Sequence, residues 1–172
     1  MEQTYLIILR LFHIATGVFW AGGMIYLARF VLPAAKALGP DGGKFMSQLA
    51  MTNNLPIVMM VSATLNILSG VLLFWKISNG FSSDWMGSSF GATLSLGGLI
   101  AIVAYTIGLS VNRPATFKLA AIAKQVAAAG GVPTPEQVAD LNATRMKLVK
   151  ATNTVAILLG ITVVCMAVAR YM

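Results

Sequence analysis

Residues 55–75 read LPIVMMVSATLNILSGVLLFW, a stretch without a single charged side chain. An α-helix of about 20 such residues crosses the hydrocarbon core of a bilayer, which is roughly 30 Å thick. Pro56 stands in the first turn, where its missing N–H costs little, and Lys76 follows the last apolar residue. The stretch therefore predicts a transmembrane helix.

Three other stretches have the same character. The first of them is uncharged from Leu11 to Ala28, and Pro33 is expected to mark its exit from the membrane. The composition agrees, because 58% of the 172 residues are apolar and only 10% are charged, against about a quarter in soluble proteins. We therefore expect an all-α, four-helix transmembrane bundle that forms one integral membrane domain over residues 1–172. The predicted spans are residues 5–32, 55–75, 90–112 and 153–169.

Basic residues decide the predicted orientation. With four spans, the segments 33–54 and 113–150 lie on one side of the membrane and both termini lie on the other. The side with the termini holds only three of the 12 Lys and Arg residues, namely Arg10, Lys76 and Arg170. Basic loops stay inside, so we expect a multi-pass protein of the cell (inner) membrane with both termini outside. Contact with the anionic lipid bilayer then accounts for the formal charge of +7. No motif indicates binding to nucleic acid.

The segment 113–150 has a helical pattern of its own. Residues 115–129 are rich in helix formers and end at Gly130–Gly131, a typical helix stop. Thr134 then offers an N-cap, followed by a proline and by Gln137, which can close a capping box. No helix breaker separates this second helix from the fourth span. We therefore expect the third and fourth spans to extend past the membrane as a cytoplasmic helical hairpin.

The residues best suited to chemistry lie on the first span. Arg10, His13, Gly17 and Trp20 follow one another at intervals of three, four and three, so they share one helical face. Ionisable residues inside spans mark functional sites by default. Neutral imidazole ligates haem iron or copper, and an arginine one turn away pairs with a haem propionate. His13 is therefore a candidate metal ligand, and Arg10, Gly17 and Trp20 are candidate cofactor-binding residues.

The same face also has a purely structural interpretation. His13 would then donate a hydrogen bond to a neighbouring helix, while Arg10 reaches outward to lipid phosphates. Ser62, Asn66 and Ser69 share one face of the second span and are the expected interhelical hydrogen-bonding partners. A glycine on the first span would let two helices pack closely, as well as clear room for a flat cofactor.

Ten methionines and the single Cys165 raise the question of a soft-ligand copper site. Met59 and Met60 are adjacent and Met24 stands alone, so no methionine ladder runs along a span. Methionine also serves as apolar filler. One histidine and one cysteine exclude a multi-histidine site and a disulfide within the chain. The usual hydrolase and nucleotide-binding motifs are absent.

The string FHIATGVFWAGG at residues 12–23 resembles the "LH, six residues, W-x-G-G" signature of the copper-resistance D (CopD-like) membrane proteins, with Phe12 in place of leucine. Residues 63–75 and 166–171 resemble related uncharacterised four-span proteins. The resemblance to the copper-resistance group implies copper import or copper delivery. His13 also matches the early-span histidine of the HemJ-type protoporphyrinogen oxidases, which hold haem b. Their later-span lysine has no counterpart, because Lys76 stands at a span end.

Three functions remain open on these grounds. The first is haem b binding by His13 in the outer half of the bundle, in a redox or haem-handling role. The second is copper transport or delivery, and the third is a non-catalytic accessory subunit with no cofactor. A single histidine is compatible with all three. Ligation of one haem by two histidines would require a homodimer, and an accessory role would require a larger membrane complex.

Overall fold

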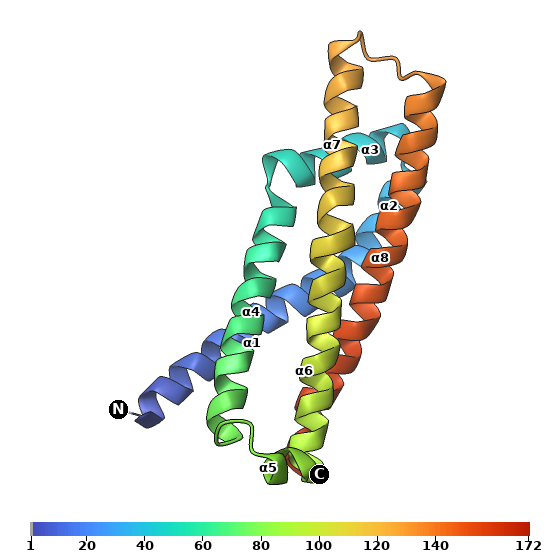
Figure 1. Cartoon of the computed structure of the whole chain (residues 1–172). Helices are drawn as coiled ribbons and strands as arrows, with labels where there is room; N and C mark the ends of the chain where they lie inside the picture. The colour runs from blue at the N-terminus through green and yellow to red at the C-terminus, as the bar shows by residue number, and fades with distance from the viewer. Residues whose placement is uncertain (1) are drawn as a thin grey trace.

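The computed structural model describes residues 2–172, which are almost entirely helical and contain no strand. Four long helical segments are long and apolar enough to cross a membrane. The predicted all-α four-helix bundle is therefore confirmed (Figure 1). The four segments cover Gln3–Ala37, Leu55–Ile77, Ser89–Ala128 and Pro135–Tyr171.

The first and third segments each contain an α-helix, a π turn and a further α-helix, which follow one another without a break. In chain order the elements are α1 (Glu2–Tyr26), η1 (Leu27–Val31), α2 (Leu32–Ala37), α3 (Pro40–Ser47), η2 (Gln48–Thr52), α4 (Leu55–Ile77), α5 (Ser83–Gly87), α6 (Ser89–Ile107), η3 (Gly108–Asn112), α7 (Arg113–Ala128), α8 (Pro135–Val168) and η4 (Ala169–Tyr171). Of these, η1, η2 and η3 are π-helical and η4 is a 3₁₀ turn.

The bundle consists of two tightly packed helix pairs. Helix α4 packs chiefly against α1, and α6 packs against α8. Helix α1 is steeply inclined to the other three, and both termini lie at the end of the bundle opposite the α7–α8 hairpin (Figure 1). The core is formed where α1 crosses α4 and α8, and there the Trp20 and Tyr105 rings meet edge to face at 6.3 Å. Its buried members are Trp20, Ala21, Met24, Met59, Ala63, Ala104, Val155 and Leu159.

The predicted helical hairpin is present. Helix α7 ends at Ala128, and both Gly130 and Gly131 adopt positive φ angles, 94° and 85°. The Thr134 hydroxyl accepts from the Gln137 N–H while the Gln137 side chain accepts from the Thr134 N–H, so the capping box is closed. The two arms are also joined by an ion pair of 2.7 Å between Lys118 and Asp140.

Two features of the chain path go beyond the predicted spans. The first helix does not stop at Pro33 but continues through it to Ala37. A π turn leaves one position without its regular i→i−4 bond, and Pro33, which has no N–H, lies two residues after the end of η1. The segment 33–54 is itself largely helical. It folds into α2, α3 and η2, with one sharp reversal at Gly39, whose φ is 58°.

Candidate functional site

His13 joins α1 to α4 through the main chain of Asn66. The Nδ1 atom of His13 lies 3.0 Å from the Asn66 carbonyl oxygen, and the Asn66 side-chain amide donates to the His13 carbonyl at 2.8 Å. Ser69 lies 3.2 Å from the same Nδ1, and its hydroxyl donates to the Leu65 and Asn66 carbonyls. Asn66 and Ser69 are therefore interhelical partners as predicted, whereas Ser62 makes no side-chain hydrogen bond with a described residue.

The hydrogen-bonding pattern assigns the tautomer of His13. A carbonyl oxygen only accepts, so Nδ1 carries the proton and donates to Asn66. The second ring nitrogen, Nε2, then carries a lone pair. It has no hydrogen-bond partner among the described residues and is not sealed inside the bundle. A histidine held through Nδ1–H by a carbonyl, with Nε2 free, is oriented as metal-ligating histidines usually are.

The side chains of this cluster fill the space beside two glycines. A Cβ placed on Gly17 would lie 2.8 Å from the Asn66 amide nitrogen, and one on Gly70 would lie 2.8 Å from the His13 ring. The space beside Gly17 is therefore occupied by the Asn66 amide and does not form a groove for a flat cofactor. This is the close-packing use of small residues in membrane helices.

The other two predicted site residues lie apart from the imidazole. Arg10 is exposed and has no ion pair or hydrogen bond with any side chain that the structure describes. Trp20 is only 5% exposed and belongs to the core cluster. The structure thus brings His13 and Gly17 together around Asn66, and places Arg10 at the surface and Trp20 in the interior.

Metal-ligating side chains are sparse in the described part of the chain. No group of three or more His, Cys, Asp or Glu residues is placed there to hold an ion. Cys165 packs against Gly97, since a Cβ on that glycine would lie 2.9 Å from the Cys165 Cβ. This contact gives Cys165 a packing role between α8 and α6.

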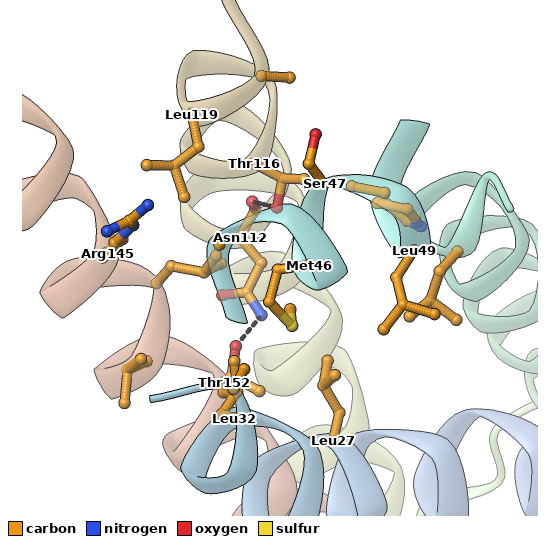
Figure 2. A pocket seen from close by; sticks show the side chains of 18 of the residues that line it. Leu27, Leu32, Met46, Ser47, Leu49, Asn112, Thr116, Leu119, Arg145 and Thr152 are labelled. Carbon is orange, nitrogen blue, oxygen red and sulfur yellow. Dashed lines mark hydrogen bonds between the residues drawn. The ribbon is translucent and has the colours of Figure 1, made fainter. Parts of the chain in front are cut away.

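A large cavity lies in the half of the bundle nearer the α7–α8 hairpin. Its volume is about 1740 Å³, whereas ligand sites commonly measure about 300–1,000 Å³. It is half open, and it is bordered by the ends of α1 and α6, the start of α4, the short helices α2 and α3, and the facing sides of α7 and α8. Figure 2 shows side chains from these elements around the same space.

The rim of this cavity is basic. Six cationic side chains line it and no carboxylate does, within the described residues. Arg145 reaches across from α8 to α3, where its Nη2 would be 3.2 Å from a Cβ on Gly43. Only Lys44 has a carboxylate partner, Asp41 at 2.9 Å, which lowers the pKa of Asp41 and raises that of Lys44. The six cations are Arg29, Lys36, Lys44, Arg113, Arg145 and Lys150.

The floor of the cavity is apolar and reaches the core of the bundle. Trp20, Met24 and Met59 are buried core residues that also line it, together with Ala63 and Tyr105. Methionine is flexible and polarisable, so it adapts to an apolar ligand of irregular shape. Six of the ten methionines line this one cavity: Met24, Met46, Met51, Met59, Met60 and Met146.

All three π turns contribute to the cavity lining. π-Helical residues are well under 1% of residues in ordinary globular proteins, and π turns are frequent at functional sites. Here η1 supplies Arg29, η2 supplies Gln48 and η3 supplies Asn112. The widened turns re-aim side chains within otherwise regular helices, and they do so around one space.

A polar cluster marks the border between rim and floor. The Asn112 amide donates to the Thr152 hydroxyl at 3.3 Å, and the Thr116 hydroxyl donates to the Asn112 carbonyl at 2.9 Å (Figure 2). Asn112 Oδ1 is buried without a partner among the described residues. A buried amide oxygen without a hydrogen-bond donor is energetically costly. Oδ1 of Asn112 is therefore an unsatisfied acceptor in largely apolar surroundings.

Sequence reasoning did not identify the cavity. From the sequence, the basic residues of its rim indicate only membrane orientation, and the methionines indicate only a copper site or apolar filler. One local signal was available. Pro33 and Pro114 each follow the end of a π turn after one residue, so a proline near the end of an apolar span indicates where a helix is distorted.

Comparisons with known proteins do not identify a relative. No family model matches the chain, and neither a curated protein nor a solved structure matches it significantly.

Proposed function

We propose that the protein is a multi-pass membrane protein that binds an anionic amphiphile in the large cavity. The anionic head would lie at the basic rim and the apolar body on the methionine-lined floor. The observation that carries this proposal is the lining itself, six cations without a carboxylate above an apolar floor. A ligand that is charged at one end and apolar at the other matches both parts.

The electrostatics favour such a ligand. Five of the six rim cations have no carboxylate partner among the described side chains. Like charges that line one space repel one another, and an anion between them relieves that repulsion. Hydrogen bonds from arginine or lysine to phosphate or carboxylate are also short and strong. Arg145, which reaches toward Gly43 over the space, is well placed to make one.

The membrane orientation belongs to the same proposal. With residues 33–54 and 113–150 in the cytoplasm and both termini outside, the basic rim meets the inner face of the cell membrane. The ligand head would then lie at the level of the cytoplasmic headgroups and its body would point into the bilayer. The basic content of the two segments supports this orientation.

Binding can be measured with a tryptophan on the cavity floor. Trp20 lines the cavity, whereas Trp75 and Trp85 do not, so a Trp75→Phe/Trp85→Phe variant reports on the cavity alone. We expect dodecyl phosphate to change the Trp20 fluorescence saturably. Zwitterionic dodecylphosphocholine should bind at least about tenfold more weakly, because a hydrogen bond to a charged group contributes about 1.5–3 kcal/mol.

One arginine variant and one lysine variant of the same helix provide a matched test. Arg145 lines the cavity and Lys147, two residues later on α8, does not. We expect Arg145→Gln to weaken dodecyl phosphate binding about tenfold or more and Lys147→Gln to leave it unchanged. Equal binding of the two amphiphiles, or equal effects of the two substitutions, would reject the proposal.

Haem b binding by His13 is a second candidate, favoured by one observation. Nδ1–H of His13 is held by the Asn66 carbonyl while Nε2 is free, an arrangement suited to an axial ligand. The filled space at Gly17 does not support a haem groove within one chain, so a second histidine would come from another copy. We expect a Soret band that His13→Ala abolishes and Ser62→Ala preserves, with a dimer in solution.

Copper delivery and an accessory role stay predictions that the same preparation tests. Copper delivery predicts a colourless protein with bound Cu(I) that is lost on replacement of methionine or Cys165. An accessory subunit predicts neither cofactor and co-purifying chains. A colourless, metal-free protein from cells with ample haem and copper would exclude both cofactor functions and leave the cavity proposal untouched.

A further inference from the structure

We propose that the occupant of the cavity is an anionic diacyl phospholipid of the surrounding bilayer, and that it enters sideways between α4 and α7. This inference rests on the proposed function and specifies both the ligand and its route. Its basis is a second cavity that lies between these two helices and shares most of its lining residues with the large one.

A second, smaller cavity lies at the place that we infer to be the side opening. Its volume is about 160 Å³, and it lies between η2 with the start of α4 on one side and α7 on the other. All its lining residues except Asn54 also line the large cavity, so the two spaces adjoin through a shared wall. The shared residues are Ala50, Met51, Pro56, Ile57, Thr116, Phe117 and Ala120.

The surface around this opening suits lipid. Met51, Ile57 and Phe117 are large apolar side chains that are 56%, 45% and 49% exposed. Arg113 lies over the Phe117 ring at 5.6 Å and also lines the large cavity. An arginine stacked on an aromatic ring is typical of the headgroup level, where a phosphate meets the charge and hydrocarbon meets the ring.

Helix packing leaves this side of the bundle weakly closed. Helix α4 packs chiefly against α1 and only lightly against α6, and α7 touches this side of the bundle mainly through η2. The gap between α4 and α7 can therefore admit a hydrocarbon chain without separation of the α1–α4 or α6–α8 pairs. A phospholipid has the anionic head for the rim and two chains long enough to occupy both the floor and the opening.

The test uses vesicles and two tryptophan reporters. The protein is reconstituted in phosphatidylcholine vesicles that contain phosphatidylglycerol with brominated acyl chains, which quench tryptophan on contact. Trp20 is 5% exposed, so lipid around the outside of the bundle does not reach it, whereas Trp75 is 48% exposed and reports that outer lipid. We expect brominated phosphatidylglycerol to quench Trp20 saturably, and brominated phosphatidylcholine at equal content to quench it at least fivefold less. Trp75 quenching should not depend on the headgroup.

A substitution at the opening separates the route from the site. Asn54→Phe places bulk at the one lining residue that the large cavity does not share, and it removes no rim charge. We expect it to reduce phosphatidylglycerol quenching of Trp20 about tenfold or more while dodecyl phosphate still binds in detergent, which also shows that the cavity remains folded. Lys147→Gln should change neither measurement.

Each outcome has a distinct meaning. If dodecyl phosphate fails to bind the unmodified cavity, the proposed function is wrong. If dodecyl phosphate binds but brominated phosphatidylglycerol leaves Trp20 unquenched, the cavity takes a soluble amphiphile and the lipid inference is wrong. If quenching is strong but unaffected by Asn54→Phe, the side route is wrong.

Discussion

His13 and Asn66 are hydrogen-bonded to each other's main chain. Nδ1–H of His13 donates to the Asn66 carbonyl at 3.0 Å, and the Asn66 side-chain amide donates to the His13 carbonyl at 2.8 Å. The reciprocal pair connects α1 and α4. Interhelical hydrogen bonds in membranes contribute about 0.6 kcal/mol on average and up to about 1.7 kcal/mol, so the pair determines the register of the two helices more than their total stability.

Gly17→Ala should separate α1 from α4. The new Cβ would lie 2.8 Å from the Asn66 amide nitrogen, so the amide must move away from His13. We expect a loss of about 1–3 kcal/mol in unfolding free energy, measured by denaturant titration in mixed micelles. Gly22→Ala is the control on the same helix, because nothing lies within 4 Å of its Cβ position. Equal stability of the two variants would contradict this account of the α1–α4 contact.

Gly97→Ala should loosen α6 from α8. Its Cβ would lie 2.9 Å from the Cys165 Cβ and 3.6 Å from the Thr162 carbonyl oxygen, and backbone-proximal atoms cannot rotate away. We again expect a loss of about 1–3 kcal/mol in the same titration. The neighbouring Gly98→Ala, with open space at its Cβ, should be neutral or slightly stabilising, because alanine favours helix. A neutral Gly97→Ala would show that the two helices tolerate a wider separation.

Thr134→Ala should weaken the tip of the hairpin and nothing else. The substitution removes the acceptor for the Gln137 N–H, and the loss of such an N-cap costs about 1 kcal/mol. Hydrogen exchange of the amides at the start of α8 should accelerate about fivefold, which corresponds to that energy. Lys147→Ala, exposed and far from the cap on the same helix, should leave these amides unchanged. Faster exchange along the whole of α8 would instead indicate that the hairpin unfolds as one unit.

The predicted membrane orientation is open to a labelling experiment. In a Cys165→Ser background, single cysteines replace Ser83 in α5 and Val132 at the tip of the hairpin, both of which are exposed. With both termini outside, a membrane-impermeant thiol reagent added to intact cells should label position 83 and spare position 132 until the cells are opened. The reverse pattern would invert the topology and would place the basic rim of the cavity on the outer face.

Several features followed from the sequence alone because they depend on neighbouring residues. Apolar stretches such as residues 55–75 must satisfy their backbone within a helix in lipid, so length and composition are enough to predict a span. The hairpin followed from local stops and caps, Gly130–Gly131 and Thr134. Asn66 and Ser69 were recognisable as polar side chains on one face of a span, which rarely point into lipid.

The presence of the cavity depends on the tertiary structure. Arg29, Arg113 and Arg145 belong to three different helical segments, and nothing in their spacing indicates that they surround one space. Their convergence depends on the two π turns that turn the ends of the first and third spans, and on the fold of residues 32–52 across the hairpin side of the bundle. The role of Gly17 also could not be predicted from the sequence, because the space beside a glycine in a span can hold either a cofactor or a neighbouring side chain. Only the packed position of Asn66 shows which of the two is there.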